Sequence, residues 1–313
     1  MTIFLLRRLL SAVVLLVVVS FLARVLLYQG IGDVARNVLG ENATEEQVAL
    51  KNQELGLDQP LIVQYFDWLT NAISGDLGVS FFSSQPVWDT LLIRLPVTLS
   101  LVVVVTLLTG VVAFAVGIYA AVRKGWVDRT LQILATLGDA LPPYIVALFL
   151  VTFFAIQQKI FPATGFIPLT ESPAGWARTI TLPVLALAIG GVAGVAQQVR
   201  SSTLGVLHHD YIRTVRSRGL SERRIILTSV LRNASTNGLT SLAVQVVGIL
   251  GGAVFIEVLF ALPGLGSLAV EAASRTDLPL IVGVVLALML IVVTVNLAVD
   301  ILVAWLNPKV RLS

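Results

Sequence analysis

Long apolar runs dominate the chain and alternate with shorter polar segments. Six runs each predict one helix, at residues 9–28, 97–122, 134–156, 180–199, 238–262 and 281–306. An α-helix needs about 20 apolar residues to cross a hydrocarbon layer roughly 30 Å thick. The pattern therefore predicts six membrane-spanning helices, which place both chain termini on the same side of the membrane.

Helices are the spanning elements that these runs favour. Backbone groups find no water inside lipid, and the strands of a membrane barrel would be about half as long, with alternating polarity. The mean hydropathy of +0.92 agrees with an all-α integral membrane protein. The first run follows Arg7 and Arg8 like a signal peptide, but it is too long and no small-residue cleavage site follows. We interpret it as a retained helix whose Arg24 reaches toward the far surface.

Basic residues in the connecting segments predict the orientation. With the N-terminus in the cytoplasm, 14 basic loop residues lie inside and 6 lie outside, and the positive-inside rule favours this arrangement. Seven arginines lie between Arg200 and Arg232. Placing them at the bilayer centre would cost on the order of 20 kcal/mol, at about 3 kcal/mol each, so this segment is expected in the cytoplasm.

The orientation and the runs divide the chain into four parts. Residues 1–28 form the cytoplasmic N-terminus and first helix, and residues 29–95 form a helical segment outside the membrane. Residues 96–306 form a five-helix core with a cytoplasmic loop at 200–236, and residues 307–313 form a cytoplasmic tail. The absence of cysteine fits a bacterial envelope protein, and the excess of arginine over lysine suggests a GC-rich genome. The expected location is the bacterial plasma (inner) membrane, as a multi-pass protein.

The segment outside the membrane carries two predicted helices. Thr44 to Gln47 has the pattern of a capping box, and Gly56 is placed to end the helix that follows. Pro60 suits the start of a second helix. Its apolar positions at helical spacing are Leu61, Ile62, Tyr65, Phe66, Leu69 and Ile73. This amphipathic helix is expected to lie on the bilayer surface, on neighbouring loops or on a partner.

The stretch HDYIRTVRSRGLSERR, residues 209–224, is a basic segment in a predominantly apolar chain. An apolar stripe on one helix is predicted for Leu204, Leu207, Tyr211 and Val215, with Arg213, Arg216 and Ser217 turned away. Gly219 is placed to end this helix, and Ser221 to cap the next one. So short a helix is stable only when it is completed by other surfaces, so a partner's groove is expected.

The segment DYIRTVRSRGLSERRIILTSVLRNA resembles the cytoplasmic loop of permease subunits in ATP-binding cassette (ABC) importers of the dipeptide, oligopeptide and nickel group. Arg213-Thr214-Val215 stand where the general motif has Glu-Ala-Ala, and Gly219 stands at its glycine. The departure is similar to that of the peptide group. Further resemblances are LGLDQPLIVQYFDWL, GDLGVS, RLPVTLSL, FIEVLFALPGLGSLAVEAASRTDLPLIVGVVL and the Asn307-Pro308-Lys309 end.

The resemblance implies a coupling helix that seats in a groove of an ATPase subunit. Tyr211, Ile212 and Val215 would be its buried contacts, and Arg213 and Arg216 its rim. The implied site also includes Thr214 and the turn at Gly219. The alternative for the arginines is the ordinary positive-inside excess or contact with anionic lipid.

The implied partners are a homologous second permease, two ATPase subunits, an extracytoplasmic substrate-binding protein and membrane lipid, without nucleic acid. No phosphate-binding G-x-x-x-x-G-K-[ST] motif is present, so no cofactor is expected on this chain, and ATP and Mg²⁺ would bind the ATPases. The function implied is that of a subunit forming half of a pathway for peptides. Nickel chelates, glutathione and haem remain open as cargo.

Acidic and turn residues near the fifth span suggest a pathway. Glu257 precedes Pro263-Gly264-Leu265-Gly266, whose turn residues predict a re-entrant or gate-like connection. We hypothesise that Glu257 lines the outer part of the channel, with a paired structural acid as the alternative. Asp139 and Asp300 are interpreted as structural acids paired with loop arginines.

Two small-residue faces predict close helix packing. They are Gly190 with Gly194 on the fourth span and Gly248 with Gly252 on the fifth. Their spacing leaves open whether they pack within the chain or against a second permease.

Two other classes of function were weighed. An autonomous secondary transporter would normally need repeats and charges near the bilayer midplane, of which the sequence offers few. An intramembrane enzyme would need a catalytic motif within the spans. The two histidines, His208 and His209, lie outside every span, and no H-E-x-x-H or G-x-S-x-G occurs. No metal site is expected, because the histidines lack neighbouring ligands at usable spacing.

Overall fold

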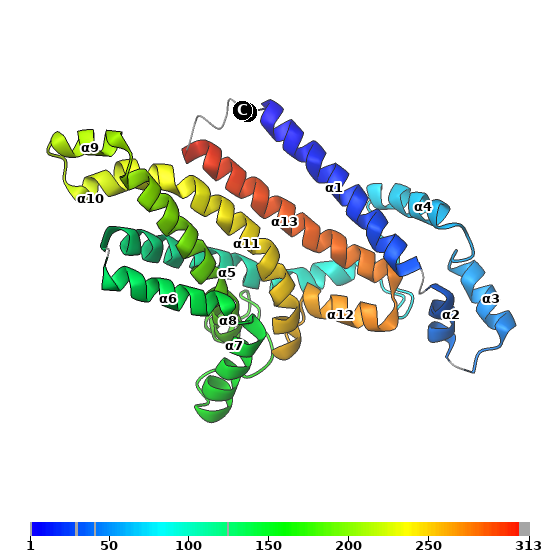
Figure 1. Cartoon of the computed structure of the whole chain (residues 1–313). Helices are drawn as coiled ribbons and strands as arrows, with labels where there is room; N and C mark the ends of the chain where they lie inside the picture. Colours follow the sequence, from blue (N-terminus) through cyan, green and yellow to red (C-terminus); the bar gives the residue numbers. More distant parts are fainter. Residues whose placement is uncertain (1, 29–30, 41, 124, 307–313) are drawn as a thin grey trace. The chain divides into compact units, whose positions relative to one another are not determined.

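The computed structural model describes residues 2–28, 31–40, 42–123 and 125–306 (Figure 1). The predicted tail at 307–313, with the Asn307-Pro308-Lys309 end, lies outside the described residues.

Helices make up nearly all of the described structure, which confirms the all-α fold class. Their bounds are α1 Thr2–Tyr28, α2 Ile31–Leu39, α3 Glu45–Glu54, α4 Leu61–Ile73, α5 Val87–Arg123, α6 Trp126–Ala140, α7 Pro143–Leu150, the π-helix η1 Val151–Gln157, α8 Pro173–Leu207, α9 Asp210–Ser217, α10 Glu222–Ile225, the π-helix η2 Ile226–Val230, α11 Leu231–Leu259, α12 Leu265–Arg275 and α13 Leu278–Leu306. Within the described residues, α1, α5, α8, α11 and α13 are each long and apolar enough to cross a membrane.

The predicted third span is not one continuous helix. It is a pair of helices bent by 95°, α6 followed by α7 and η1, and it makes a sixth span if the pair is counted as one. Leu141 leaves the helical region, with ψ 117°, because the ring of Pro142 disfavours helical backbone in the residue before it. Pro143 then starts α7, where its missing N–H costs no hydrogen bond.

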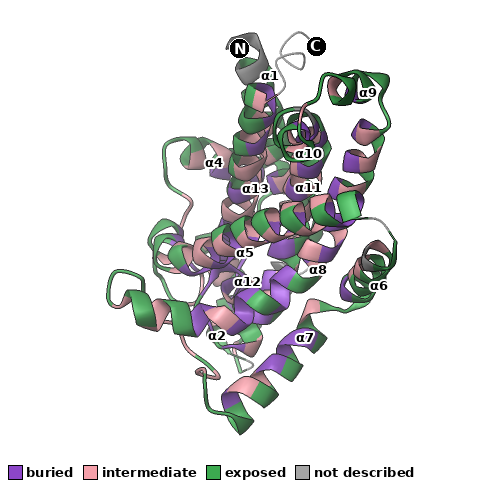
Figure 2. Cartoon of the chain, turned by 90° about the vertical axis from the view of Figure 1, so that its left-hand side faces the viewer, coloured by how far each residue is buried: buried purple, intermediate pink, exposed green. Residues whose placement is uncertain are grey.

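The chain divides into two compact units, each described here by itself. We call residues 99–262 and 292–306 the core unit, and residues 2–98 and 263–291 the flanking unit. In the core unit, α8 packs against α11, α6 and α7, and Figure 1 shows α8 and α11 side by side. Figure 2 shows α7 with a buried side and an exposed side, as expected for a helix with one packed face.

Close approach of the core-unit helices depends on single glycines. A Cβ on Gly117 would lie 2.6 Å from the carbonyl oxygen of Ala196, and one on Gly238 would lie 2.7 Å from both Phe114 and Val199. A side chain at either position would need its neighbours to shift. The absence of one lets α5, α8 and α11 approach each other closely at these glycines.

In the flanking unit, α4 packs against α1 through polar as well as apolar contacts. The Tyr65 hydroxyl donates to the carbonyl oxygen of Val17 at 2.9 Å and lies 3.0 Å from the Ser20 hydroxyl. Tyr65 and Trp68 are buried, whereas Ile62 and Phe66 are more than half exposed. Part of the predicted apolar face of α4 therefore packs within the chain, and the rest points outward.

The cap predictions for α3 are confirmed. The Thr44 hydroxyl accepts from the backbone N–H of Gln47, and the Gln47 side chain accepts from the backbone N–H of Thr44. The helix ends before Gly56, whose φ of +68° is readily adopted only without a side chain. Pro60 stands one residue before α4 rather than inside it.

Candidate functional site

The basic segment folds as a separate short helix, α9, between α8 and α10. The predicted stripe from Leu204 to Val215 on one helix is wrong, because α8 ends at Leu207 and α9 begins at Asp210. His209 has extended backbone, with ψ 142°, and it interrupts the helical hydrogen bonds. The two halves of the stripe therefore lie on different helices.

Ile212 anchors α9 to its own chain. Its side chain is fully buried in a cluster with Val206 at the end of α8, Ile225 of α10, Val230 at the end of η2 and Ala234 near the start of α11. Val215 packs against the same cluster and is only partly buried. The expectation that Ile212 contacts a partner is therefore wrong, because its side chain has no exposed surface to offer.

The opposite face of α9 is exposed and polar (Figure 2). Tyr211 is 41% exposed, and its hydroxyl accepts from Nδ2 of Asn233 at 3.1 Å. Arg213 lies 3.7 Å from Asp210, with both side chains largely in solvent, and Thr214 is exposed. A pair so exposed contributes little to stability, so this face is available to another surface.

Arg216 closes the turn between α9 and α10. Its guanidinium donates to both carboxylate oxygens of Glu222, at 2.6 and 3.1 Å, although the predicted role was a rim contact with a partner. These hydrogen bonds lower the pKa of Glu222 and raise the pKa of Arg216. Gly219, with φ +75°, makes the turn as predicted. Ser221 occupies the cap position of α10, but its side chain makes no capping hydrogen bond.

A cavity of about 400 Å³ lies beside this turn. Arg213, Arg216, Glu222 and His208 line it together with apolar residues at the ends of α5 and α8. The exposed face of α9 therefore borders this cavity. Together they form a concave surface to which another protein can bind.

An ion pair that the sequence did not reveal ties α6 to α8 near the same end. Arg200 donates to both carboxylate oxygens of Asp128, and Gln132 donates to the same carboxylate at 3.0 Å. The side chains of Arg200 and Asp128 are 22% and 16% exposed. A two-pronged, largely buried pair holds the two helices in a defined register.

The predicted gate residues form the connection from α11 to α12. Leu262, Gly264 and Gly266 are buried, whereas Pro263 is exposed. The Ser267 hydroxyl accepts from the backbone N–H of Gly264 at 3.1 Å. The connection is therefore an ordered cap of α12.

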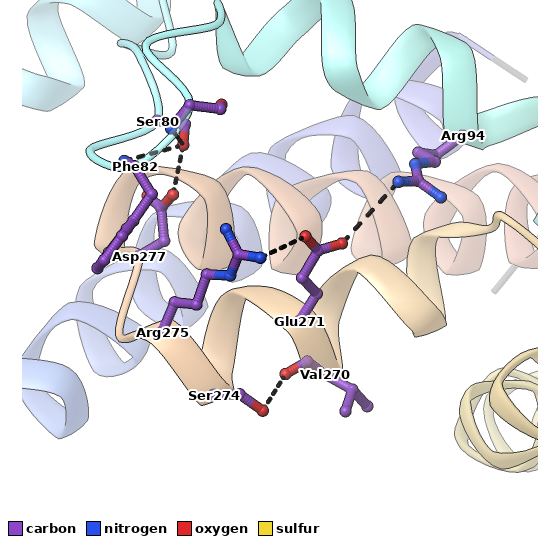
Figure 3. Close-up of polar contacts among 9 residues, drawn as sticks. Ser80, Phe82, Arg94, Val270, Glu271, Ser274, Arg275 and Asp277 are labelled. Carbon is purple, nitrogen blue, oxygen red and sulfur yellow. Dashed lines mark hydrogen bonds and ion pairs between the residues drawn. The ribbon is translucent and has the colours of Figure 1, made fainter. Parts of the chain in front are cut away.

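The far end of α12 is held by buried and exposed polar contacts (Figure 3). Asp277, 2% exposed, accepts from the Ser80 hydroxyl at 2.5 Å and from the backbone N–H of Phe81 at 3.3 Å. Figure 3 also shows Glu271 between Arg94 and Arg275, at 3.9 and 3.6 Å. The loop before α5 is thereby tied to the turn before α13, a link between residues almost 200 positions apart.

Glu257 is fully buried on α11, and the backbone N–H of Leu262 donates to its carbonyl oxygen at 2.8 Å. In this conformation its side chain offers no surface to a solute, and its place along the outer part of the channel stays a prediction. Asp139 is exposed beside α8, close to Gly194, and Asp300 is partly buried.

The predicted glycine faces differ in what they meet. A Cβ on Gly190 or Gly194 would face the end of α6, at 3.6 Å from the Gly138 carbonyl oxygen and 3.3 Å from Asp139 Oδ1. A Cβ on Gly252 would lie 3.0 Å from Leu187 of α8, whereas one on Gly248 would meet only Gln245 of its own helix. Gly190, Gly194 and Gly252 therefore serve packing within the chain.

Comparison with known proteins decides the family. The model for the inner membrane component of binding-protein-dependent transport systems matches residues 113–312, more than half of the chain. The chain belongs to this family. The model for the N-terminal part of such membrane components matches residues 1–102.

Relatives of the permease extend over its whole length. It is 39% identical to a putative peptide transport system permease protein of Brucella abortus, with 99% of each chain covered. It is 35% identical to a glutathione transport system permease protein of Shigella flexneri, with 98% of each chain covered. It is therefore a permease subunit of an ABC importer, a multi-pass inner membrane protein, and the family implies a substrate-binding protein and an ATPase as partners.

A solved structure supports the fold of the permease. The methionine ABC transporter MetNI in its inward-facing form aligns with a TM-score of 0.50 at 17% identity, covering 71% of this chain and 94% of that chain. At this identity the likeness concerns the fold alone. No group of metal-binding side chains occurs in the described part of the permease.

Proposed function

We propose that the permease forms half of a translocation pathway for peptides, completed by a homologous second permease and driven by two ATPase subunits. ATP and Mg²⁺ bind to those ATPases, and an extracytoplasmic binding protein delivers the peptide. The names of the Brucella and Sinorhizobium fredii relatives support peptides as cargo. Glutathione, the cargo named for the Shigella relative, is itself a small peptide.

One observation carries the mechanical part of the proposal. α9 has a buried face, centred on Ile212, joined to α8, α10 and α11, and an exposed face with Tyr211, Arg213 and Thr214. A force applied to the exposed face reaches α8 and α11 through close-packed atoms, because protein interiors are poorly compressible. α9 therefore acts as the coupling helix, with both termini and this helix in the cytoplasm, as the excess of basic residues favours.

The roles at the other end follow from the same arrangement. The connection at 263–266 is proposed as part of the gate, because it lies between α11 and the ordered helix α12. The backbone N–H of Gly264 donates to the Ser267 hydroxyl, which orders the start of α12 directly after this connection. Glu257, at the end of α11, is proposed as a buried acid that becomes exposed only when this connection opens.

The test is uptake by proteoliposomes that contain the complete transporter. Labelled dipeptide and labelled glutathione are offered with the binding protein outside and ATP inside. We expect dipeptide uptake that disappears when ATP, the ATPases or the binding protein is omitted. Uptake by the permease alone, driven by an ion gradient, would contradict the proposal. Uptake of glutathione but not of dipeptide would agree with the mechanism and would identify glutathione as the cargo.

A further inference from the structure

A groove of about 760 Å³ runs along three helices of the core unit and reaches η2 at one end. Leu107 and Val111 of α5, Leu231 and Leu242 of α11, and Leu302 of α13 are among the residues that line it. Leu107 and Val111 are 63% and 71% exposed, so the groove is open at its side. All three helices are membrane spans, so this opening faces the bilayer or a neighbouring chain.

The stretch of the groove that follows α11 from Arg232 onward has about the length of one lipid leaflet. On α11 it follows a single face from Arg232 through Ser235 and Leu239 to Leu242. Ten residues of helix extend about 15 Å at roughly 1.5 Å per residue. Half of a hydrocarbon layer roughly 30 Å thick is also about 15 Å.

One end of the groove carries a cation. Arg232 lies among the lining residues, is exposed, and stands where the basic segment ends and α11 begins. Its Nε donates to the carbonyl oxygen of Leu306 at 2.9 Å, which holds the guanidinium against α13. Among the described residues, no carboxylate forms an ion pair with Arg232, so its charge is available to an anion at the leaflet surface.

The chemistry of the groove points to its occupant. An acyl chain matches the apolar side chains that line it, and an anionic head group matches the position of Arg232.

We propose that this groove binds one anionic phospholipid of the leaflet on the side of α9, with its acyl chains between α5, α11 and α13 and its phosphate at Arg232. The lipid fills a space that would otherwise leave apolar side chains without contacts. The arginine gives the site a preference for anionic lipid, because charge-assisted hydrogen bonds to phosphate are strong. The site does not depend on which solute is transported.

The test uses the complete transporter, delipidated in mild detergent and titrated with phosphatidylglycerol or phosphatidylcholine of identical acyl chains. Native mass spectrometry counts the bound lipids and also reports whether the assembly is intact. We expect phosphatidylglycerol to bind the wild type about tenfold more tightly than phosphatidylcholine. Arg232→Gln should lower this preference to about one, while Arg224→Gln, an exposed arginine outside the groove, should leave it unchanged.

A second variant tests the groove itself. Leu107→Trp places a larger side chain in it and should reduce the occupancy by both lipids. The proposal is overturned if the wild type does not distinguish the two lipids, or if Arg232→Gln binds phosphatidylglycerol as the wild type does. It is also overturned if a photo-cross-linker on Leu107→Cys in native membranes captures a polypeptide segment instead of phospholipid.

Discussion

Replacing Ile212 by Ala should detach α9, the proposed coupling helix, from the helices against which it packs. The substitution removes about three methyl or methylene groups from a fully buried side chain. At about 0.8 kcal/mol per group, the loss is about 2.4 kcal/mol before any cavity term, and substitutions of this kind cost about 2–5 kcal/mol. A loss of about 2.4 kcal/mol corresponds to a roughly 60-fold larger population of detached α9.

Hydrogen exchange of the backbone amides of residues 210–217 measures this detachment in the purified transporter. We expect exchange in α9 to accelerate about 60-fold, with unchanged exchange in residues 180–199 of α8. Peptide transported per ATP hydrolysed should fall, because ATPase motion no longer reaches the spans. Thr214→Ala, on the exposed face, is the matched control and should leave exchange of α9 within about twofold of the wild type. Exchange of α9 equally slow in Ile212→Ala would refute the role of Ile212 as the anchor.

Three further predictions concern packing and charge in the core unit. Gly117→Ala should lower the thermal unfolding temperature of the detergent-purified protein, because the new Cβ meets the carbonyl oxygen of Ala196 at 2.6 Å; an unchanged temperature would contradict this close approach. Arg200→Met should destabilise the protein by about 1–3 kcal/mol, because it leaves Gln132 as the remaining partner of the Asp128 carboxylate; chemical unfolding measures the loss, and removing that carboxylate as well should restore part of it. The pKa of Glu222 is lowered by Arg216, so the stability from their pair is present above the unfolded-state pKa and is lost as the pH falls through the lower folded-state value. Exchange in residues 216–225, corrected for intrinsic rates, should therefore rise modestly at acid pH in the wild type and lose this pH dependence in Glu222→Gln.

The spans were predictable from sequence because lipid imposes a length and forbids unpaired backbone groups. The break at Leu141 was readable in principle, since two consecutive prolines follow it and disfavour helix before them. An apolar run taken by itself conceals such a break, because hydropathy measures solvent preference and carries no information on backbone direction.

The buried faces of short helices were less predictable. In a soluble protein an apolar stripe marks the core, but in a membrane protein apolar side chains also suit lipid. The exposed Ile62 and Phe66 on α4 illustrate this, because buried Tyr65 and Trp68 lie on the same helix. On α9 both Tyr211 and Ile212 are apolar neighbours, and only the position of α10 and α11 decides which one is buried.

Contacts between distant residues were beyond the reach of the sequence. Asp128 and Arg200 are 72 positions apart, and each alone looks like an ordinary loop-end charge. Asp277 and Ser80 are 197 positions apart. Family resemblance drew attention to the basic loop, yet the sequence alone did not indicate that Arg216 pairs within the chain.

Cross-linking at a single position tests the central claim most directly. The chain has no cysteine, so Thr214→Cys on the exposed face of α9 and Ser274→Cys on the exposed side of α12 each introduce one reactive thiol. In inner membranes containing the full transporter, a short bifunctional reagent should join Thr214→Cys to the ATPase subunit and leave Ser274→Cys unjoined to it. If Thr214→Cys remains unlinked to the ATPase in an assembled, active transporter, α9 is not the element that couples ATP hydrolysis to transport.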